Sequence, residues 1–239
     1  MALLLTLFAL LLLSAIGLFM VLSSNTETRI DANYGSSLRA YYAVRSGIEE
    51  VRERIKYPSG SPGGLADKLP TDVAGNSNGV LYIVNPAAGE TVDPANPANV
   101  FFDDQLCHDY NSDTPAGIKC TTVPSADKWQ SSLPAMTPGQ LGYKWVRINI
   151  KTNRTVAPNY CVDQQPCALT SPLMDMPVCW DGQAEQISPG GNCDANGMQT
   201  VYMLTALATS GATGPNGARK LLKFEVVAPS IRPAGAVTA

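Results

Sequence analysis

The first 57 residues read MALLLTLFALLLLSAIGLFMVLSSNTETRIDANYGSSLRAYYAVRSGIEEVRERIKY and contain no proline. Residues 1–22 within them carry no charged side chain. At 1.5 Å per residue, a helix over this apolar part is roughly 30 Å long, which matches the hydrocarbon core of a bilayer. We therefore predict that residues 1–22 form a transmembrane helix half.

A cleaved secretory signal is the alternative for this apolar segment. The apolar region of such a signal usually has about 7–15 residues and is followed by a small-x-small cleavage site. Residues 1–22 run longer and end without that site, which favours an anchor. Anchors normally carry Lys or Arg before the span, yet the first basic residue is Arg29. This order predicts either that a basic leader is removed before Met1 or that the true start lies upstream.

The helical pattern continues beyond the apolar segment and becomes amphipathic. Steps of three and four residues connect the apolar positions Ile30, Tyr34, Leu38, Tyr41, Val44, Ile48, Val51 and Ile55. The other face carries Arg39, Arg45, Glu49, Arg52, Glu53 and Lys56, with favourable i,i+3 pairs Glu49–Arg52 and Glu53–Lys56. Pro58 ends the pattern. We predict one helix of about 55 residues whose second half, residues 23–57, packs on a globular domain, residues 58–239.

A short apolar run and the alternation of apolar and polar residues elsewhere predict that this globular domain is β-rich. The predicted strands are Val80–Val84, Lys144–Lys151, Val201–Ser210 and Arg219–Ala228. In the second of these, Val146, Ile148 and Ile150 point one way, and Trp145, Arg147, Asn149 and Lys151 point the other way. In the last, Leu222, Phe224 and Val226 are predicted to face inward. We therefore expect an α+β fold with an antiparallel sheet that has one buried face, covered by the helix.

Composition argues against several classes of function. The chain has 17 Lys and Arg against 20 Asp and Glu, which gives a net charge of −3, and nucleic-acid binders normally have a basic face. A single histidine leaves little room for zinc-hydrolase or Ser-His-Asp chemistry. The glycine-rich stretch 211–220 lacks the spacing of a P-loop and is predicted to be a hairpin turn. We expect no enzyme activity, no cofactor and no nucleic-acid partner.

The six cysteines all follow the apolar segment, and none forms a CxxC motif, which argues against a zinc ribbon or a thioredoxin-type site. Six cysteines allow 15 connectivities. We predict that neighbours pair and close short loops, as Cys107–Cys120, Cys161–Cys167 and Cys179–Cys193. Disulfides place the domain outside the cytoplasm.

This combination resembles a type IV pilin-like subunit, in particular a PilX-type minor pilin, with a shorter likeness to the K-type pseudopilin of type II secretion. Residues 1–51 carry the resemblance. After the apolar run come the patch Ser23–Arg29, the step Ala32–Asn33, and the end Tyr42–Ala43 followed by Gly47–Ile48–Glu49. The segment VYMLTALATS…ARKLLKFEVV resembles the closing hairpin of that family.

The resemblance implies a ladle-shaped fold, processing and N-methylation at Met1, and a path from the inner membrane into a pilus or periplasmic filament. Its partners would be other pilins or pseudopilins, which the helix would contact through Ala9, Ser14, Ala15, Gly17, Ile30, Tyr34, Leu38 and Ile48. Most pilins have glutamate as the fifth mature residue, whereas this chain has Leu5. The K-type pseudopilin also lacks this acid and lies at a filament tip. We therefore predict a minor or tip subunit, with adhesion as a further role.

Two alternatives stay open. The first concerns Asp109, Asn111 and Asp113, which match the first ligand positions of an EF-hand, whereas Thr114 and Cys120 stand where its Gly and Glu belong. Because some pilin-like proteins bind calcium in loops, these residues, near Asp103 and Asp104, form either a different calcium site or a solvated acidic loop. The second alternative is an anchored periplasmic binding domain that never polymerises.

Overall fold

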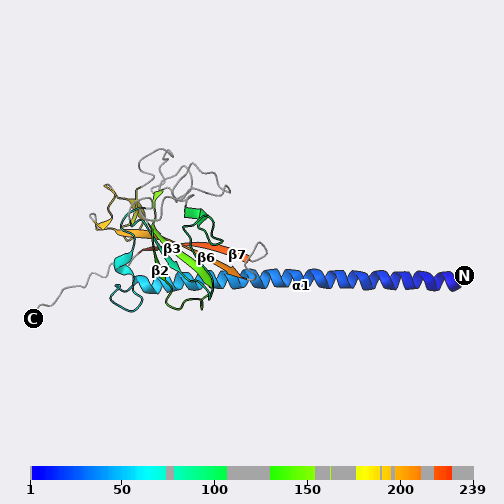
Figure 1. The fold of residues 1–239 in the computed structure, drawn as a ribbon. Helices are drawn as coiled ribbons and strands as arrows, with labels where there is room; N and C mark the ends of the chain where they lie inside the picture. The colour runs from blue at the N-terminus through cyan, green and yellow to red at the C-terminus, as the bar shows by residue number, and fades with distance from the viewer. Residues whose placement is uncertain are drawn as a thin grey trace, which may run out of the picture.

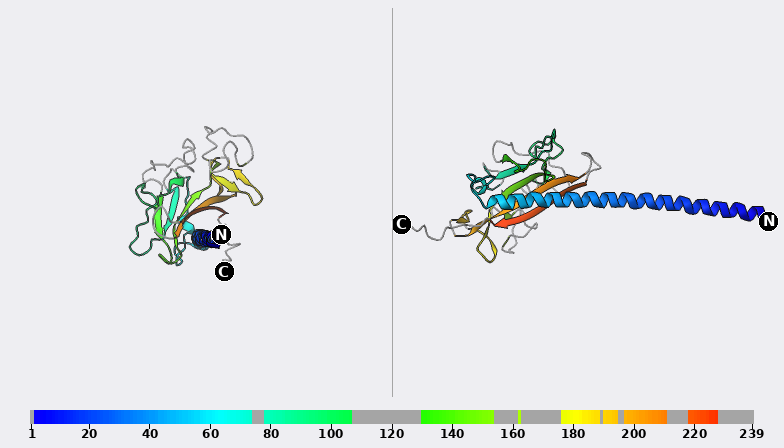
Figure 2. Two further views of the ribbon diagram at one scale, coloured as in Figure 1. Left: turned by 90° about the vertical axis from the view of Figure 1, so that its right-hand side faces the viewer. Right: turned by 90° about the horizontal axis from the view of Figure 1, so that it is seen from below.

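A single long helix and one sheet make up the fold. The computed structural model describes residues 2–73, 78–106, 130–153, 162, 176–188, 190–194, 197–210 and 218–227. The helix α1 (Ala2–Ile55) has 54 residues, which confirms the predicted continuous helix. Figure 1 shows that its C-terminal part lies along the sheet and that its N-terminal part projects away from the domain, and the views in Figure 2 agree.

The sheet has seven strands among the described residues, in the order β2-β1-β3-β6-β4-β5, with β7 also paired to β6. Their bounds are β1 (Val80–Val84), β2 (Gln130–Pro134), β3 (Tyr143–Ile150), β4 (Val178–Trp180), β5 (Glu185–Ile187), β6 (Gln199–Ser210) and β7 (Ala218–Val227), and a short 3-10 helix, η1 (Ala66–Lys68), precedes them. The four predicted strands correspond to β1, β3, β6 and β7. The pair β1–β2 is parallel, and the other strand pairs are antiparallel.

The last part of α1 packs on the face of the sheet formed by β3, β6 and β7. Val44, Ile48, Val51 and Ile55 are buried in one apolar cluster with residues of the sheet, including Leu81, Ile83, Val146, Ile148, Leu204 and Ala206. Leu222 and Val226 of β7 pack against this cluster as predicted, while Phe224 between them is 42% exposed. Each fully buried Val or Ile side chain contributes about 1.5–3 kcal/mol, so this contact is the main apolar term that holds the helix in place.

A buried ion pair reinforces the contact between the helix and the sheet. Arg54 Nη1 lies 3.1 Å from Glu50 Oε1, and both side chains are less than a tenth exposed. The Tyr143 hydroxyl donates to Glu50 Oε2 (2.6 Å), and Arg54 Nη1 also donates to the Pro134 carbonyl (3.0 Å). Burial, together with the Glu50 carboxylate, raises the pKa of Tyr143 above its usual range, so the hydroxyl stays a donor. The last two turns of α1 are thereby bonded to β2 and β3.

The strands β1, β3 and β6 are buried on both faces, so the prediction of a single buried face was wrong for this part of the sheet. Trp145 of β3, predicted to point outward, is fully buried in a second apolar cluster with Tyr82, Phe101 and Leu106. Its Nε1 donates to the Phe101 carbonyl (2.6 Å). The segment that follows β1 therefore covers this face. Alternation shows which residues share a face, but it does not show whether another segment covers that face.

A fully buried ion pair lies under the same segment. Arg147 Nη1 contacts Asp103 Oδ2 at 2.7 Å, and both side chains are completely buried. Arg147 Nε donates to Asn149 Oδ1 and Nη2 donates to Thr205 Oγ1 (both 3.1 Å), while the Tyr82 hydroxyl donates to Asp103 (3.0 Å). Burial raises the pKa of Tyr82 well above its usual value. Asp103 therefore does not belong to a solvated acidic loop, which corrects that interpretation for this residue.

Lys151, which directly follows β3, repeats this pattern. Although it was predicted to point outward, its side chain is only 6% exposed. Its Nζ lies 2.7 Å from Glu185 Oε2 of β5 and 2.8 Å from Glu225 Oε1 of β7. The basic residues Lys144, Arg147 and Lys151 in and just after β3 are thus partners for acids brought from other segments, and Lys151 connects the β4–β5 hairpin to the main sheet.

Replacing Arg147 with Met is expected to lower the free energy of unfolding by about 3–5 kcal/mol, because Asp103 is left buried without a cation. Chemical denaturation of the full chain in detergent micelles measures this change. Arg52→Ala is the matched control. It removes an exposed pair with Glu49 and should cost less than about 1 kcal/mol. Equal effects of the two substitutions would contradict a structural role for the buried pair.

Gly47 permits the close approach of α1 to the sheet. A Cβ at this position would lie 2.8 Å from Tyr143 Cγ and 3.0 Å from Val146 Cγ2, whereas a Cβ at Gly35 would meet nothing within 4 Å. We expect Gly47→Ala to destabilise the chain by about 1–3 kcal/mol through overpacking. Gly35→Ala should instead stabilise it by about 0.5–1 kcal/mol through helix propensity. Thermal unfolding of both variants tests the opposite signs.

Candidate functional site

The N-terminal part of α1 presents apolar side chains that no other described part of the chain covers. Large residues from Leu3 (78% exposed) to Leu22 (58% exposed) all face outward. Of the helices within the described residues, α1 alone is long and apolar enough to cross a membrane. By length and composition, this segment suits a membrane anchor or a signal sequence.

The helix continues without interruption through the polar residues that follow the apolar segment. Thr26 Oγ1 donates to the Leu22 carbonyl and Thr28 Oγ1 donates to the Ser24 carbonyl (both 2.9 Å). Within the apolar segment, Thr6 Oγ1 donates to the Leu3 carbonyl (3.0 Å). These hydroxyl groups bond to their own helix, so the apolar and amphipathic parts form one uninterrupted rod.

The small residues predicted to allow close helix packing have no such role within this chain. Ala9, Ser14, Ala15 and Gly17 are all exposed. A Cβ at Gly17 would meet no atom within 4 Å, in contrast to Gly47. The fold of the single chain thus leaves these positions available, and their contact with other chains stays a prediction.

The predicted apolar stripe of α1 divides at Ala40. Ile30, Tyr34 and Leu38 are exposed, whereas Ile48 lies in the core. The sheet is too short to cover the earlier residues, because β6 ends at Ser210, whose carbonyl accepts a bond from Ser36 Oγ (3.2 Å). The expectation that the whole amphipathic half packs on the domain is therefore correct only from about Gly35 onward. The pairs Glu49–Arg52 and Glu53–Lys56 form as predicted.

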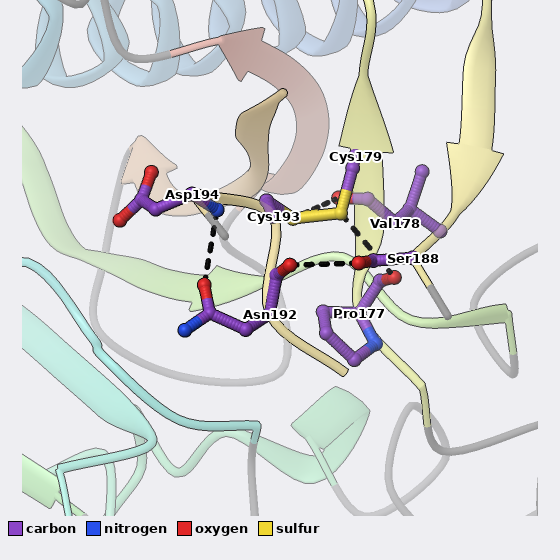
Figure 3. The surroundings of a disulfide bond; sticks show 7 residues. All are labelled: Pro177, Val178, Cys179, Ser188, Asn192, Cys193 and Asp194. Atoms are coloured by element: carbon purple, nitrogen blue, oxygen red, sulfur yellow. Dashed lines mark hydrogen bonds between the residues drawn. A yellow bond between two sulfur atoms is a disulfide. The ribbon is translucent and has the colours of Figure 1, made fainter. Parts of the chain in front are cut away.

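One predicted disulfide is present, between Cys179 of β4 and Cys193, with a Cα–Cα distance of 5.4 Å. Figure 3 shows how it holds the turn after β5 against β4. Ser188 Oγ donates to the Asn192 carbonyl (2.7 Å), and the Asp194 amide donates to Asn192 Oδ1 (3.0 Å). The disulfide thus closes a short hairpin that has little apolar core. The other predicted pairs, Cys107–Cys120 and Cys161–Cys167, lie outside the described residues.

A cavity of about 320 Å³ lies beside this disulfide, between the turn and the main sheet. Its lining includes Asp194 and Tyr202, whose hydroxyl donates to the Pro70 carbonyl (3.2 Å). Burial, together with the charge of Asp194, raises the pKa of Tyr202 to about 12. The described residues contain no group of three or more His, Cys, Asp or Glu that could hold a metal. Asp109, Asn111 and Asp113 lie outside the described residues, as does Met1.

The whole chain was also compared with known proteins. No protein-family model matches it, and no significant match was found among curated proteins or solved structures. The architecture nevertheless defines a class. A long apolar N-terminal helix packed on a mostly antiparallel sheet is the arrangement of pilin-like proteins.

The disulfide predicts a measurable contribution to stability. Replacing Cys179 and Cys193 together with Ser is expected to lower the free energy of unfolding by about 3 kcal/mol, the chain-entropy value for a loop of this size. Denaturation of the full chain measures the change, and mapping of non-reduced peptides should recover a fragment that links the two cysteines. Separate, alkylated peptides from the native protein would contradict the assignment.

Proposed function

We propose that this chain is a structural subunit of a type IV pilus or a related secretion filament. The observation that carries the proposal is the continuous α1 helix, which its own domain leaves uncovered from Ala2 to about Tyr34. Soluble proteins rarely expose contiguous apolar patches of more than a few hundred Å². A surface of this kind needs lipid or protein around it.

During assembly, the apolar half of α1 would pass from a lipid environment to a protein environment. Before assembly, lipid would surround the apolar half, and in the filament, other helices would take the place of lipid. Lipid tails and apolar side chains are about equally apolar, so this transfer costs little hydrophobic energy. Close packing of the helices depends on small residues, and Ala9, Ala15 and Gly17 leave room for it.

The part of α1 between the apolar half and the domain favours a filament over a simple anchor. Residues 23–34 would extend the helix by about 18 Å beyond the bilayer core. They keep Ile30 and Tyr34 exposed on a rigid helix. An anchored binding domain needs only a short tether, whereas a filament subunit needs a helix long enough to contact its neighbours over this distance.

We further propose a minor or tip position, because Leu5 stands where most pilins carry the glutamate that pairs with a neighbour's N-terminal amine. Processing would leave Met1 as a methylated N-terminus. The outer loops would provide adhesion, with no enzymatic role, no cofactor and no nucleic-acid partner. Calcium at Asp109, Asn111 and Asp113 stays an open alternative.

The proposal predicts that the chain is recovered in filaments sheared from cells that produce a tagged copy. Gly17→Leu should lower this recovery by about fivefold, because a large side chain separates helices that pack through small residues. Gly60→Leu is the matched control, since a Cβ there also meets nothing within 4 Å and lies outside the helix. Its recovery should equal that of the unaltered chain. Quantitative immunoblots of sheared filaments and of membranes measure both pools.

The same fractions separate the proposal from its rival. A chain that stays entirely in the membrane, in cells that make filaments, would instead identify an anchored binding domain. N-terminal sequencing adds a second criterion. A methylated amine on Met1 is expected, and an extended, uncleaved N-terminus would count against filament assembly.

A further inference from the structure

The cavity beside the Cys179–Cys193 disulfide is of the size of a small-molecule site. Its volume of about 320 Å³ lies within the usual range of about 300–1,000 Å³ for such sites. It is enclosed by the turn 191–194, the end of β3, the start of β6, and Pro70 with Thr71. Figure 1 shows the β4–β5 hairpin, in yellow, at the end of the domain opposite the projecting half of α1. The cavity therefore lies away from the part of α1 that a membrane would surround.

Tyr202 presents an oxygen acceptor to this cavity. Its hydroxyl donates its single hydrogen to the Pro70 carbonyl (3.2 Å), which leaves the lone pairs of Oη for a further partner. Burial, together with the charge of Asp194, raises the pKa of Tyr202 to about 12, so the hydroxyl keeps this hydrogen at neutral pH. A ligand that bonds to Oη in this arrangement must therefore supply the hydrogen.

Asp194 adds a negative charge to the same cavity. Its carboxylate makes no ion pair with a Lys or Arg among the residues that the structure describes. The backbone amide of Asp194, not its carboxylate, holds the turn through Asn192 Oδ1 (3.0 Å). Figure 3 shows that the carboxylate points away from the disulfide. The charge is thus not needed for the fold of the turn and is available to a ligand.

The lining argues against an anionic ligand. Among the described residues that line the cavity there is no Lys, Arg or His. An anion would therefore lie close to Asp194 with no cationic side chain to pair with, which is unfavourable. The cavity favours a ligand that carries positive charge and hydrogen-bond donors.

A primary ammonium group has both properties, because it has one positive charge, three N–H donors and no acceptor. One N–H can bond to the Asp194 carboxylate and another to Tyr202 Oη, while the hydroxyls of Thr71 and Thr200 can accept the third. Calcium matches less well, since it takes 6–8 oxygen ligands and usually several carboxylates. The described lining contains one carboxylate.

The cavity is larger than an ammonium group requires, and part of its wall is apolar. Ile150 and Pro177 line it together with the polar side chains. A carbon chain attached to the ammonium group would remove this apolar surface from water, which is favourable. The ligand that fits both parts of the wall is a short alkylamine.

We propose that the cavity beside the Cys179–Cys193 disulfide binds a primary ammonium group carried on a short alkyl chain. Asp194 pairs with the charge, Tyr202 accepts one N–H, and Ile150 contacts the chain. Free alkylamines and the lysine side chain of a partner protein both carry this group. The site lies in the globular domain and goes beyond the proposed function, so its test does not depend on filament assembly.

Titration of the full chain in detergent micelles with n-butylammonium tests the site, with NMR signals of ¹³C-labelled tyrosine as the readout. The Tyr202 signal, identified by its loss in Tyr202→Phe, should shift and saturate with a Kd on the order of 1 mM, as suits a ligand of this size. Two probes separate charge from hydrogen bonding. Butyltrimethylammonium keeps the charge without N–H donors, and 1-butanol has no charge. Each should bind at least about fivefold more weakly.

Substitutions assign the contact to Asp194. Asp194→Asn should weaken butylammonium binding by about tenfold, because it removes the charge while the backbone bond to Asn192 remains. Thr71→Lys should weaken it by a similar factor, because the new ammonium group competes at the cavity. Asp31→Asn is the matched control. It removes the same charge from an exposed position on α1 and should leave the affinity unchanged.

A lysine analogue distinguishes the two sources of the ammonium group. If Nα-acetyl-lysine methylamide binds as tightly as butylammonium, the site accepts a lysine side chain of a partner, and if it does not bind, the site accepts free alkylamines. The proposal is overturned if either control probe binds as tightly as butylammonium, or if Asp194→Asn leaves the affinity unchanged. It is equally overturned if calcium ions shift the Tyr202 signal and prevent butylammonium binding.

Discussion

The apolar contact between the last third of α1 and the sheet is the constraint on which the rest of the molecule depends. Gly47 lets the helix lie directly on Tyr143 and Val146, and the buried pair Glu50–Arg54 fixes its last two turns. Because α1 is one continuous helix, its remaining part extends from this end away from the domain, as Figure 1 shows. A flexible joint near Ala40 would leave the same apolar residues exposed, but at no defined angle to the domain.

The second face of the sheet has a different physical basis. Arg147 and Asp103 are 44 residues apart and meet where neither has access to water. An isolated charge in that place would cost several kcal/mol, so the pair forms only when the segment after β1 lies on the sheet in one arrangement. Whereas apolar packing tolerates small shifts, this network has defined partners. Lys151 likewise pairs with Glu185 of β5 and Glu225 of β7.

Local patterns account for what the sequence predicted, and contacts between distant segments account for what it missed. The continuous α1 follows from helical periodicity, the span of β1 from a short apolar run, and the pairing of Cys179 with Cys193 from their short spacing. By contrast, β2 (QSSLP) has no alternation and forms because β1 offers a parallel edge. The signal for Glu50–Arg54 was present as an i,i+4 spacing, but nothing local indicated its burial. Likewise, the exposure of Ile30, Tyr34 and Leu38 depends on where β6 ends.

The boundary near Ala40 therefore separates a part of α1 that has partners within the chain from a part that has none among the described residues. Beyond it, the inward-facing apolar side chains, Gly47 and the charges from Glu49 onward find partners within the chain. Before it, the apolar side chains, the charges Glu27, Arg29, Asp31 and Arg39, and the open space at Gly17 have none among the described residues. These three properties change at nearly the same place although they are chemically independent. Lipid can account for the apolar half, but lipid cannot account for ordered charges and tyrosines that lie beyond the bilayer. The proposed filament neighbour would contact this segment and would account for all three.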